Sequence, residues 1–294
     1  MLKHRLAVGI PLGVLALAAF LWPGWPGSLL FLAFGAFLVV VGLKEFHDMA
    51  DAMGLPGARR ASTVAGLGFL LAPVLAALLS PQSPVHLAGA LDAAVLTLLL
   101  ALLAVDLLRA GPSRESLARC GVSLAAVAYV AWSVSFLAKL YFSGVDGPRL
   151  ALFAVVATKS ADIGAFVLGS LTAKLPGGNH KLCPRLSPKK SWEGLVGGIL
   201  ASLACCFGLL RLWPDSLTLD GVQAVTRTTA LVFGLVAPCL GLLGDVAESG
   251  FKRASGFKDS GKLPGLGGVL DILDSPIFVA PCFYAYLILT AAAA

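Results

Sequence analysis

The chain alternates between long apolar stretches and short polar connections. Stretches of about 20 mostly apolar residues are separated by segments that contain charged residues, glycines or prolines. A helix rises about 1.5 Å per residue, so a stretch of this length crosses a hydrocarbon core of about 30 Å. The pattern therefore predicts an all-α polytopic membrane protein with about nine transmembrane helices. The predicted spans are residues 5–22, 28–43, 61–80, 86–106, 120–142, 150–170, 193–212, 229–249 and 275–292.

Composition leads to the same class. Of the 294 residues, 58% are hydrophobic and 13% are charged, whereas about a quarter of the residues of a soluble domain are charged. A soluble globular domain is therefore excluded, and a lipid bilayer is an expected partner. The sequence contains no recognisable nucleic-acid-binding module, so nucleic acid is not an expected partner.

The basic residues of the connections lie mostly on one side of the predicted membrane. In the connections, seventeen Lys and Arg residues fall on the side of the N-terminus and three on the other side. The whole chain has a net charge of +6. Because basic residues are retained on the cytoplasmic side, this predicts a cytoplasmic N-terminus and a C-terminus on the opposite side. The location expected is a bacterial-type inner or plasma membrane.

The polar residues divide one predicted membrane domain, residues 1–294, into two halves. Residues 1–140 are mostly plain hydrophobic spans with short links and form a scaffold half. Residues 150–285 contain nearly all the polar residues inside spans and the two most charged cytoplasmic connections, and they form a catalytic half. No internal repeat stands out, which weakens an inverted-repeat transporter as an alternative.

The segment from Asp245 to Asp274 has carboxylates at both ends of a glycine-rich turn. Asp245, Glu248 and Lys252 fall on one face of a helix that continues from the preceding apolar run. The sequence PGLGG then returns the chain to Asp271 and Asp274. Carboxylates, lysines and exposed glycine amides are what Mg²⁺ and a polyphosphate require. The alternative is a solvated charged loop between two membrane helices.

Charged residues also lie inside two spans. Lys159 and Asp162 are about midway through the sixth span, where charges are costly unless they are paired or face water. They are candidates for a functional site, and the alternative is that they neutralise each other as an i, i+3 pair. Lys139 lies nearer the end of the fifth span and is expected to extend its ammonium group to the membrane surface.

The connection after the sixth span is strongly basic and ends at a helix start. Ser191 is positioned to cap the helix that follows, and its neighbour Lys190 belongs to a cluster of basic residues. Since this connection and Asp245 both face the cytoplasm in the predicted topology, they indicate a cytoplasm-facing polar cavity. A lipid headgroup and a nucleotide would meet there; the alternative is a topology signal without a ligand.

These residues resemble the integral-membrane phosphatidate cytidylyltransferases, also called CDP-diacylglycerol synthases. The stretches ADIGAF and SPKKSWEG are similar to two further segments of that family, and the resemblance covers about residues 150–285. The long family signature, S-x-[apolar]-K-R-x4-K-D-x-[small] followed by P-G-H-G-G-x-x-D-R-x-D, is matched by Ser249, Phe251, Lys252, Arg253, Lys258, Asp259, Gly261, Pro264, Gly265, Gly267, Gly268, Asp271 and Asp274.

The chain departs from the signature at three points. Leu266 stands where the family has His, Ile272 stands where it has Arg, and the segment between Gly261 and Pro264 is one residue short. The carboxylates are kept. Because an apolar residue replaces the His, that His is not an indispensable proton carrier here.

The resemblance implies that CTP and phosphatidate are converted to CDP-diacylglycerol and pyrophosphate, with Mg²⁺ required and a second cation of unknown identity. A homodimer is also considered. Catalysis is assigned to Asp245, Asp271 and Lys252, metal binding to Asp245, Asp271 and Asp274, and substrate binding to Asp162, Lys190, Ser191, Glu248, Ser249, Arg253, Lys258, Asp259, Gly265, Gly267 and Gly268. Two alternatives stay open: a CTP-dependent lipid kinase of the polyprenol or phytol type, and an ion-coupled transporter.

Overall fold

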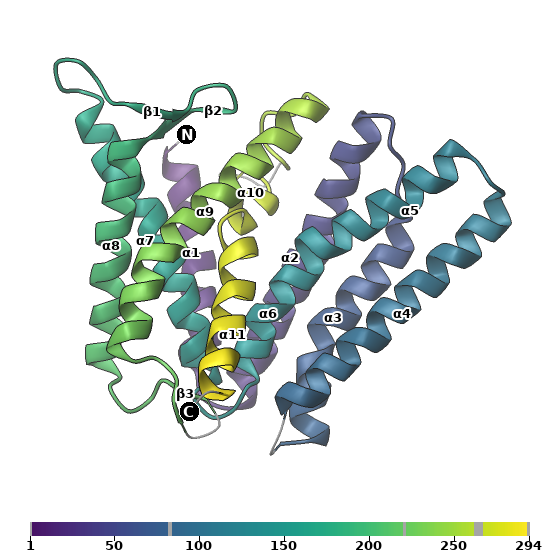
Figure 1. Ribbon diagram of the computed structural model, residues 1–294, viewed down its shortest axis with the longest axis horizontal. Helices are drawn as coiled ribbons and strands as arrows, with labels where there is room; N and C mark the ends of the chain where they lie inside the picture. The colour runs from purple at the N-terminus through teal and green to yellow at the C-terminus, as the bar shows by residue number, and fades with distance from the viewer. Residues whose placement is uncertain (1, 82–83, 220–221, 262–266, 293–294) are drawn as a thin grey trace. The chain divides into compact units, whose positions relative to one another are not determined.

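The computed structural model describes residues 2–81, 84–219, 222–261 and 267–292, without the side chains of residues 2–10, 12, 291 and 292. Within these ranges the chain is mainly helical, and eight helices are long and apolar enough to cross a membrane (Figure 1). They match the second to ninth predicted spans, and the first predicted span corresponds to a further helix, α1. The predicted all-α polytopic membrane protein is confirmed.

The chain falls into two compact units. The first consists of Met1–Gly144 with Phe251–Leu273, and the second of Val145–Gly250 with Asp274–Ala294. The predicted single domain with a scaffold half and a catalytic half stays a prediction.

The first unit is built around α2 and α3, which pack against each other and against the fifth span. Its core contains Leu43, Phe69 and Leu70, each at most 3% exposed. The fifth span contains one stretch of π-helix, η1, between two α-helical segments. The elements are α1 (Leu2–Leu21), α2 (Trp25–Ala52), α3 (Arg59–Leu79), α4 (Pro84–Ala110), α5 (Arg114–Ala126), η1 (Val127–Trp132), α6 (Ser133–Tyr141) and α10 (Leu270–Leu273).

The prediction for Lys139 was wrong. Its side chain is buried in the first unit, where the ammonium group forms an ion pair with Asp92 of α4 and lies 3.8 Å from the centre of the Phe136 ring. A carboxylate from a neighbouring helix meets the ammonium group inside the unit, so Lys139 does not extend to the membrane surface. The hydrophobic pattern of one span does not reveal a partner that another span supplies.

The second unit consists of four long helices and two short hairpins. Its elements are α7 (Gly147–Thr172), β1 (Lys181–Cys183), β2 (Ser187–Ser191), α8 (Trp192–Leu212), β3 (Thr218–Leu219), β4 (Val222–Gln223), α9 (Arg227–Ser255) and α11 (Pro276–Ala292). The last turn of α9, residues 251–255, belongs to the first unit. Helices α7 and α8 approach so closely that a β-carbon at Gly164 would overlap the main-chain oxygen of Gly197. Small residues at such interfaces are typical of membrane helices.

The basic connection after α7 is folded as an antiparallel hairpin, which the helical pattern did not predict. Lys181 of β1 pairs with Ser191 of β2, and the hairpin lies at one end of α7 and α8 (Figure 1). The predicted cap is confirmed: the Ser191 hydroxyl accepts a hydrogen bond of 3.1 Å from the amide of Gly194. The hairpin thus ends directly at the start of α8.

Candidate active site

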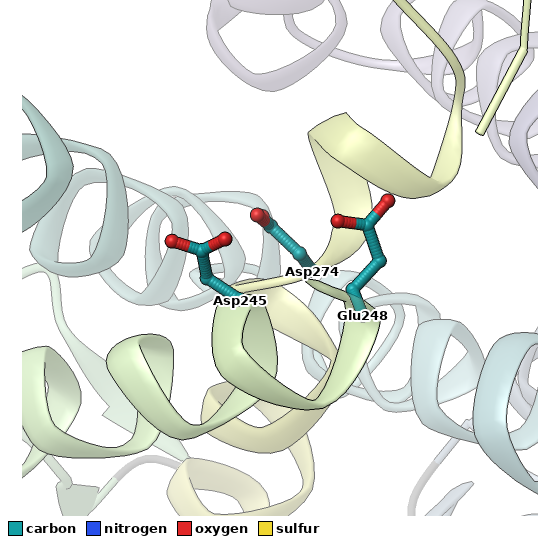
Figure 2. A group of neighbouring side chains, drawn as sticks. All are labelled: Asp245, Glu248 and Asp274. Carbon is teal, nitrogen blue, oxygen red and sulfur yellow. The ribbon is translucent and has the colours of Figure 1, made fainter. Parts of the chain in front are cut away.

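Three carboxylates meet in the second unit. Asp245 and Glu248 lie one turn apart on α9, and Asp274 lies in the link that precedes α11. One oxygen from each lies within 4.8 Å of the others, and Figure 2 shows Asp274 between the other two on the same side of α9. Glu248 is 1% exposed. The structure therefore brings together Asp245 and Asp274, two predicted metal ligands, and adds Glu248, which the sequence assigned to substrate.

Two glycines of α9 allow the link to approach. A β-carbon at Gly244 would overlap the main-chain oxygen of Asp274, and one at Gly241 would lie 3.2 Å from the β-carbon of Ser275. The close approach thus depends on the missing side chains, and it brings Asp274 alongside the two carboxylates of α9.

Two lysines neutralise part of this acidic group. The Lys190 ammonium group of β2 forms an ion pair with Asp245. Lys159 lies 3.1 Å from Asp162, as the structural alternative predicted, and 3.9 Å from Asp274. The sixth span, the basic connection and the eighth span therefore supply charged residues to one place, as the sequence analysis expected of Asp162, Lys190 and Asp245.

Ser275 joins the carboxylates and was missed by the sequence analysis. Its hydroxyl lies 3.2 Å from Oδ1 of Asp162 and 3.2 Å from Oδ1 of Asp274, and its amide donates to Asp274 at 2.6 Å. The residue is 1% exposed. Its position directly after Asp274 in the sequence could have identified it as a site residue.

The donors of this site suit a cation. Four carboxylates gather here, and the ammonium groups of Lys159 and Lys190 contact three of them, those of Asp162, Asp274 and Asp245. Carboxylate oxygens are hard ligands of the kind that Mg²⁺ accepts. The donor set therefore fits a divalent cation with oxygen ligands.

A second polar group lies in the first unit. Oδ1 of Asp271 accepts a hydrogen bond of 2.6 Å from the ammonium group of Lys252. Its Oδ2 accepts hydrogen bonds from the Ser260 amide at 3.2 Å, the Ser260 hydroxyl at 3.0 Å and the Gly268 amide at 2.6 Å. The two predicted catalytic residues Asp271 and Lys252 thus contact each other, and Gly268, predicted to bind phosphate, donates its amide to Asp271.

Asp245 and Asp271 belong to different units, so their joint binding of a cation stays a prediction.

The remaining predicted substrate residues differ in backbone and exposure. Gly267 has a backbone φ of +84°, in the left-handed region that favours glycine. Among the other predicted substrate residues, Ser249 is half-buried, and the exposed ones are Arg253, Lys258 and Asp259. Gly265 lies outside the described residues, as do Pro264 and Leu266.

Comparison with known proteins places this geometry in context. A model of the cytidylyltransferase family matches residues 3–290. The chain is 31% identical over 279 residues to a phosphatidate cytidylyltransferase of Staphylococcus saprophyticus, a match that covers 94% of this chain and 96% of the relative. It is 31% identical over 280 residues to a phosphatidate cytidylyltransferase of Staphylococcus aureus, with 94% and 96% covered. A relative of the same name in Staphylococcus epidermidis is also 31% identical, over 286 residues, with 94% and 97% covered.

Proposed function

The chain belongs to the cytidylyltransferase family, and from this premise we propose that it transfers the cytidylyl group of CTP to phosphatidate, giving CDP-diacylglycerol and pyrophosphate. The observation that carries the proposal is the match to phosphatidate cytidylyltransferases over 94% of the chain. The eight apolar helices agree with a lipid substrate, because phosphatidate is held in a bilayer.

The reaction needs charge neutralisation more than a strong base. A phosphate oxygen of phosphatidate attacks the α-phosphorus of CTP, a new P–O bond forms, and the bond from that phosphorus to the bridging oxygen breaks. Pyrophosphate leaves with the electron pair. The nucleophile is already an anion, so the barrier is mainly the repulsion between two anions. Groups that neutralise negative charge as it shifts to the leaving group lower this barrier.

We propose that Asp245, Glu248 and Asp274 hold Mg²⁺, which when bound supplies Lewis-acid polarisation of phosphate oxygens. The support is a compact set of oxygen donors, one from each carboxylate, within 4.8 Å of one another. Asp271 stays a proposed metal ligand, and a second cation stays a proposal.

The lysines of the site are proposed to bind phosphate. The ammonium group of Lys190 has three N–H donors. One donates to Asp245, and the others are suited to a phosphate oxygen. The Lys190 side chain is 31% exposed, so a phosphate can reach it. Lys252, held by Asp271, supplies the same kind of donor from the first unit. Ser275 orients Asp162 and Asp274 through its hydroxyl.

The protein is an integral membrane protein, as its apolar helices and its bacterial relatives indicate. We further propose that the N-terminus and the active site face the cytoplasm, where CTP is available, and that the C-terminus lies on the opposite side. The support is the excess of basic residues on one side of the predicted spans. A homodimer stays an expectation.

Turnover by the purified full-length protein tests the proposed function. Detergent-solubilised protein is incubated with labelled CTP, phosphatidate and Mg²⁺, and the expected products are a cytidylated lipid and pyrophosphate. Release of CDP with phosphorylation of a lipid alcohol would instead indicate a lipid kinase. Ion flux into liposomes without CTP turnover would indicate a transporter, and either result overturns the proposal.

A further inference from the structure

Glu45 is a buried carboxylate that the sequence analysis did not single out. It lies in α2 and is 5% exposed. Burying a carboxylate is costly unless several hydrogen bonds compensate for the lost water. The hydrogen-bond donors around Glu45 therefore identify the part of the chain that this carboxylate holds in place.

Among the described residues, the segment that follows α9 supplies the hydrogen bonds to Glu45. Its Oε1 accepts one of 2.9 Å from the amide of Val269, and its Oε2 accepts one of 2.9 Å from the amide of Leu270. The hydroxyl of Ser260 lies 3.0 Å from the same Oε2. One side chain of α2 thus binds both ends of the stretch between Ser260 and Leu270.

Close packing fixes the same geometry. A β-carbon at Gly261 would overlap Oε1 of Glu45, and one at Gly268 would lie 2.6 Å from Oε2. Ser260 is 2% exposed. The carboxylate fills the space left by the two missing side chains, so the backbone at Gly261 and Gly268 lies directly against it.

Ser260 connects Glu45 to the proposed machinery. Its hydroxyl lies 3.0 Å from Glu45 Oε2 and 3.0 Å from Asp271 Oδ2, and Asp271 in turn binds the ammonium group of Lys252. The hydroxyl has one proton and donates to one carboxylate at a time, while the Ser260 amide donates to Asp271 Oδ2 at 3.2 Å. These contacts join the four residues inside the first unit.

We propose that Glu45 is a positioning residue: through Ser260 and the amides of Val269 and Leu270, it fixes Asp271, which holds the ammonium group of Lys252. The consequence for catalysis rests on the proposed function, in which Lys252 binds phosphate. The placement of the segment itself does not rest on it.

The Glu45→Gln variant tests the proposal, with Asp48→Asn as the matched control. Gln keeps the size of the side chain, but it has one acceptor oxygen, and its amide group meets an N–H donor. Asp48 lies one turn further along α2, is 35% exposed and pairs with Lys44 and Arg59 instead. Two measurements are made on the full-length protein in detergent: kcat/KM for CTP per folded molecule, and hydrogen exchange of the peptide that covers residues 267–273.

We expect kcat/KM to fall by about 10-fold to 100-fold in Glu45→Gln, because groups that orient functional residues typically contribute that much. Exchange should become faster in residues 267–273, and Asp48→Asn should change neither quantity. Faster exchange with unchanged kcat/KM would overturn the positioning role. So would a loss of activity that only follows the loss of folded protein.

Ser260→Ala provides a second variant if Glu45→Gln does not fold. It removes the hydroxyl between the two carboxylates but leaves Glu45 in place, and the same local exchange and the same loss of kcat/KM are expected. Wild-type values in Ser260→Ala would overturn the proposal. If the wild-type protein does not turn over CTP and phosphatidate, the proposed function fails, and the exchange of residues 267–273 still decides whether Glu45 holds the segment.

Discussion

The main-chain oxygen of Asp274 lies so close to the α-carbon of Gly244 that a β-carbon on Gly244 would overlap it. A residue without a side chain on α9 is therefore a condition for placing Asp274 beside Asp245 and Glu248. Backbone approach, rather than attraction between side chains, brings these acidic groups together.

Gly244→Ala is expected to displace the link that carries Asp274. The overlap is with backbone, which cannot rotate away, so we expect a loss of about 1–3 kcal/mol in the free energy of unfolding together with a loss of turnover. Thermal unfolding in detergent and the CTP assay measure the two effects. Gly250→Ala, on the same helix with open space around it, is the control. Equal behaviour of the two variants would contradict this account.

Asp245→Asn and Asp274→Asn are each expected to lower kcat by about 100-fold to 1000-fold, the range found when one group that contributes to electrostatic stabilisation of a transition state is removed. Folding should be kept, because Asn is close in size to Asp. Asp215→Asn, a change at an exposed carboxylate after α8, serves as the control. Activity within a few-fold of wild type at ordinary Mg²⁺ would remove the tested residue from the proposed metal site.

Lys190→Met is expected to lower kcat/KM for CTP by about 10-fold to 100-fold. The change removes a charged donor, and hydrogen bonds to charged groups contribute about 1.5–3 kcal/mol. Steady-state kinetics with varied CTP measures the effect. Lys189→Met alters the exposed neighbour in the same hairpin and should leave kcat/KM nearly unchanged. An equal loss in both variants would indicate a general effect of the basic surface instead.

The buried pair of Lys139 and Asp92 is expected to matter for stability. Lys139→Met leaves the Asp92 carboxylate buried without its partner and should cost about 3–5 kcal/mol, whereas the double variant Lys139→Met with Asp92→Leu should recover much of this loss. Thermal unfolding in detergent measures both. Arg119→Met breaks the pair with Asp106, which is about one-third exposed, and should cost at most about 1 kcal/mol. A double variant no more stable than Lys139→Met would speak against this explanation.

Features that depend on a single segment of the chain could be predicted from the sequence. The spans follow from the length of apolar stretches, and the Ser191 cap follows from a serine placed just before a helix. Spacing on α9 also placed Asp245 and Glu248 on one face. Each of these follows from the residues of one segment alone.

Features that depend on how one helix faces another were not predicted. Asp92 meets Lys139 because of how their helices are rotated, and Glu45 meets Ser260 because the segment after α9 packs against α2. Hydropathy determines neither the rotation of a helix nor the identity of its neighbours. A lone carboxylate in an apolar span gives the same hydropathy pattern whether it faces a lysine, an amide or water. The π-helical turn η1 and the hairpin β1–β2 likewise break the regular period that the predictions used.

The burial of Lys139 against Asp92 also bears on how the chain enters the membrane. Each charge alone would oppose the release of its helix into lipid, by up to about 2.5–3.5 kcal/mol at the centre of a helix on insertion scales. Residues 84–110 are synthesised before residues 133–141, so α4 leaves the ribosome before the counterion of Asp92 has been made. The ion pair thus couples the biogenesis of two consecutive spans, the fourth and the fifth.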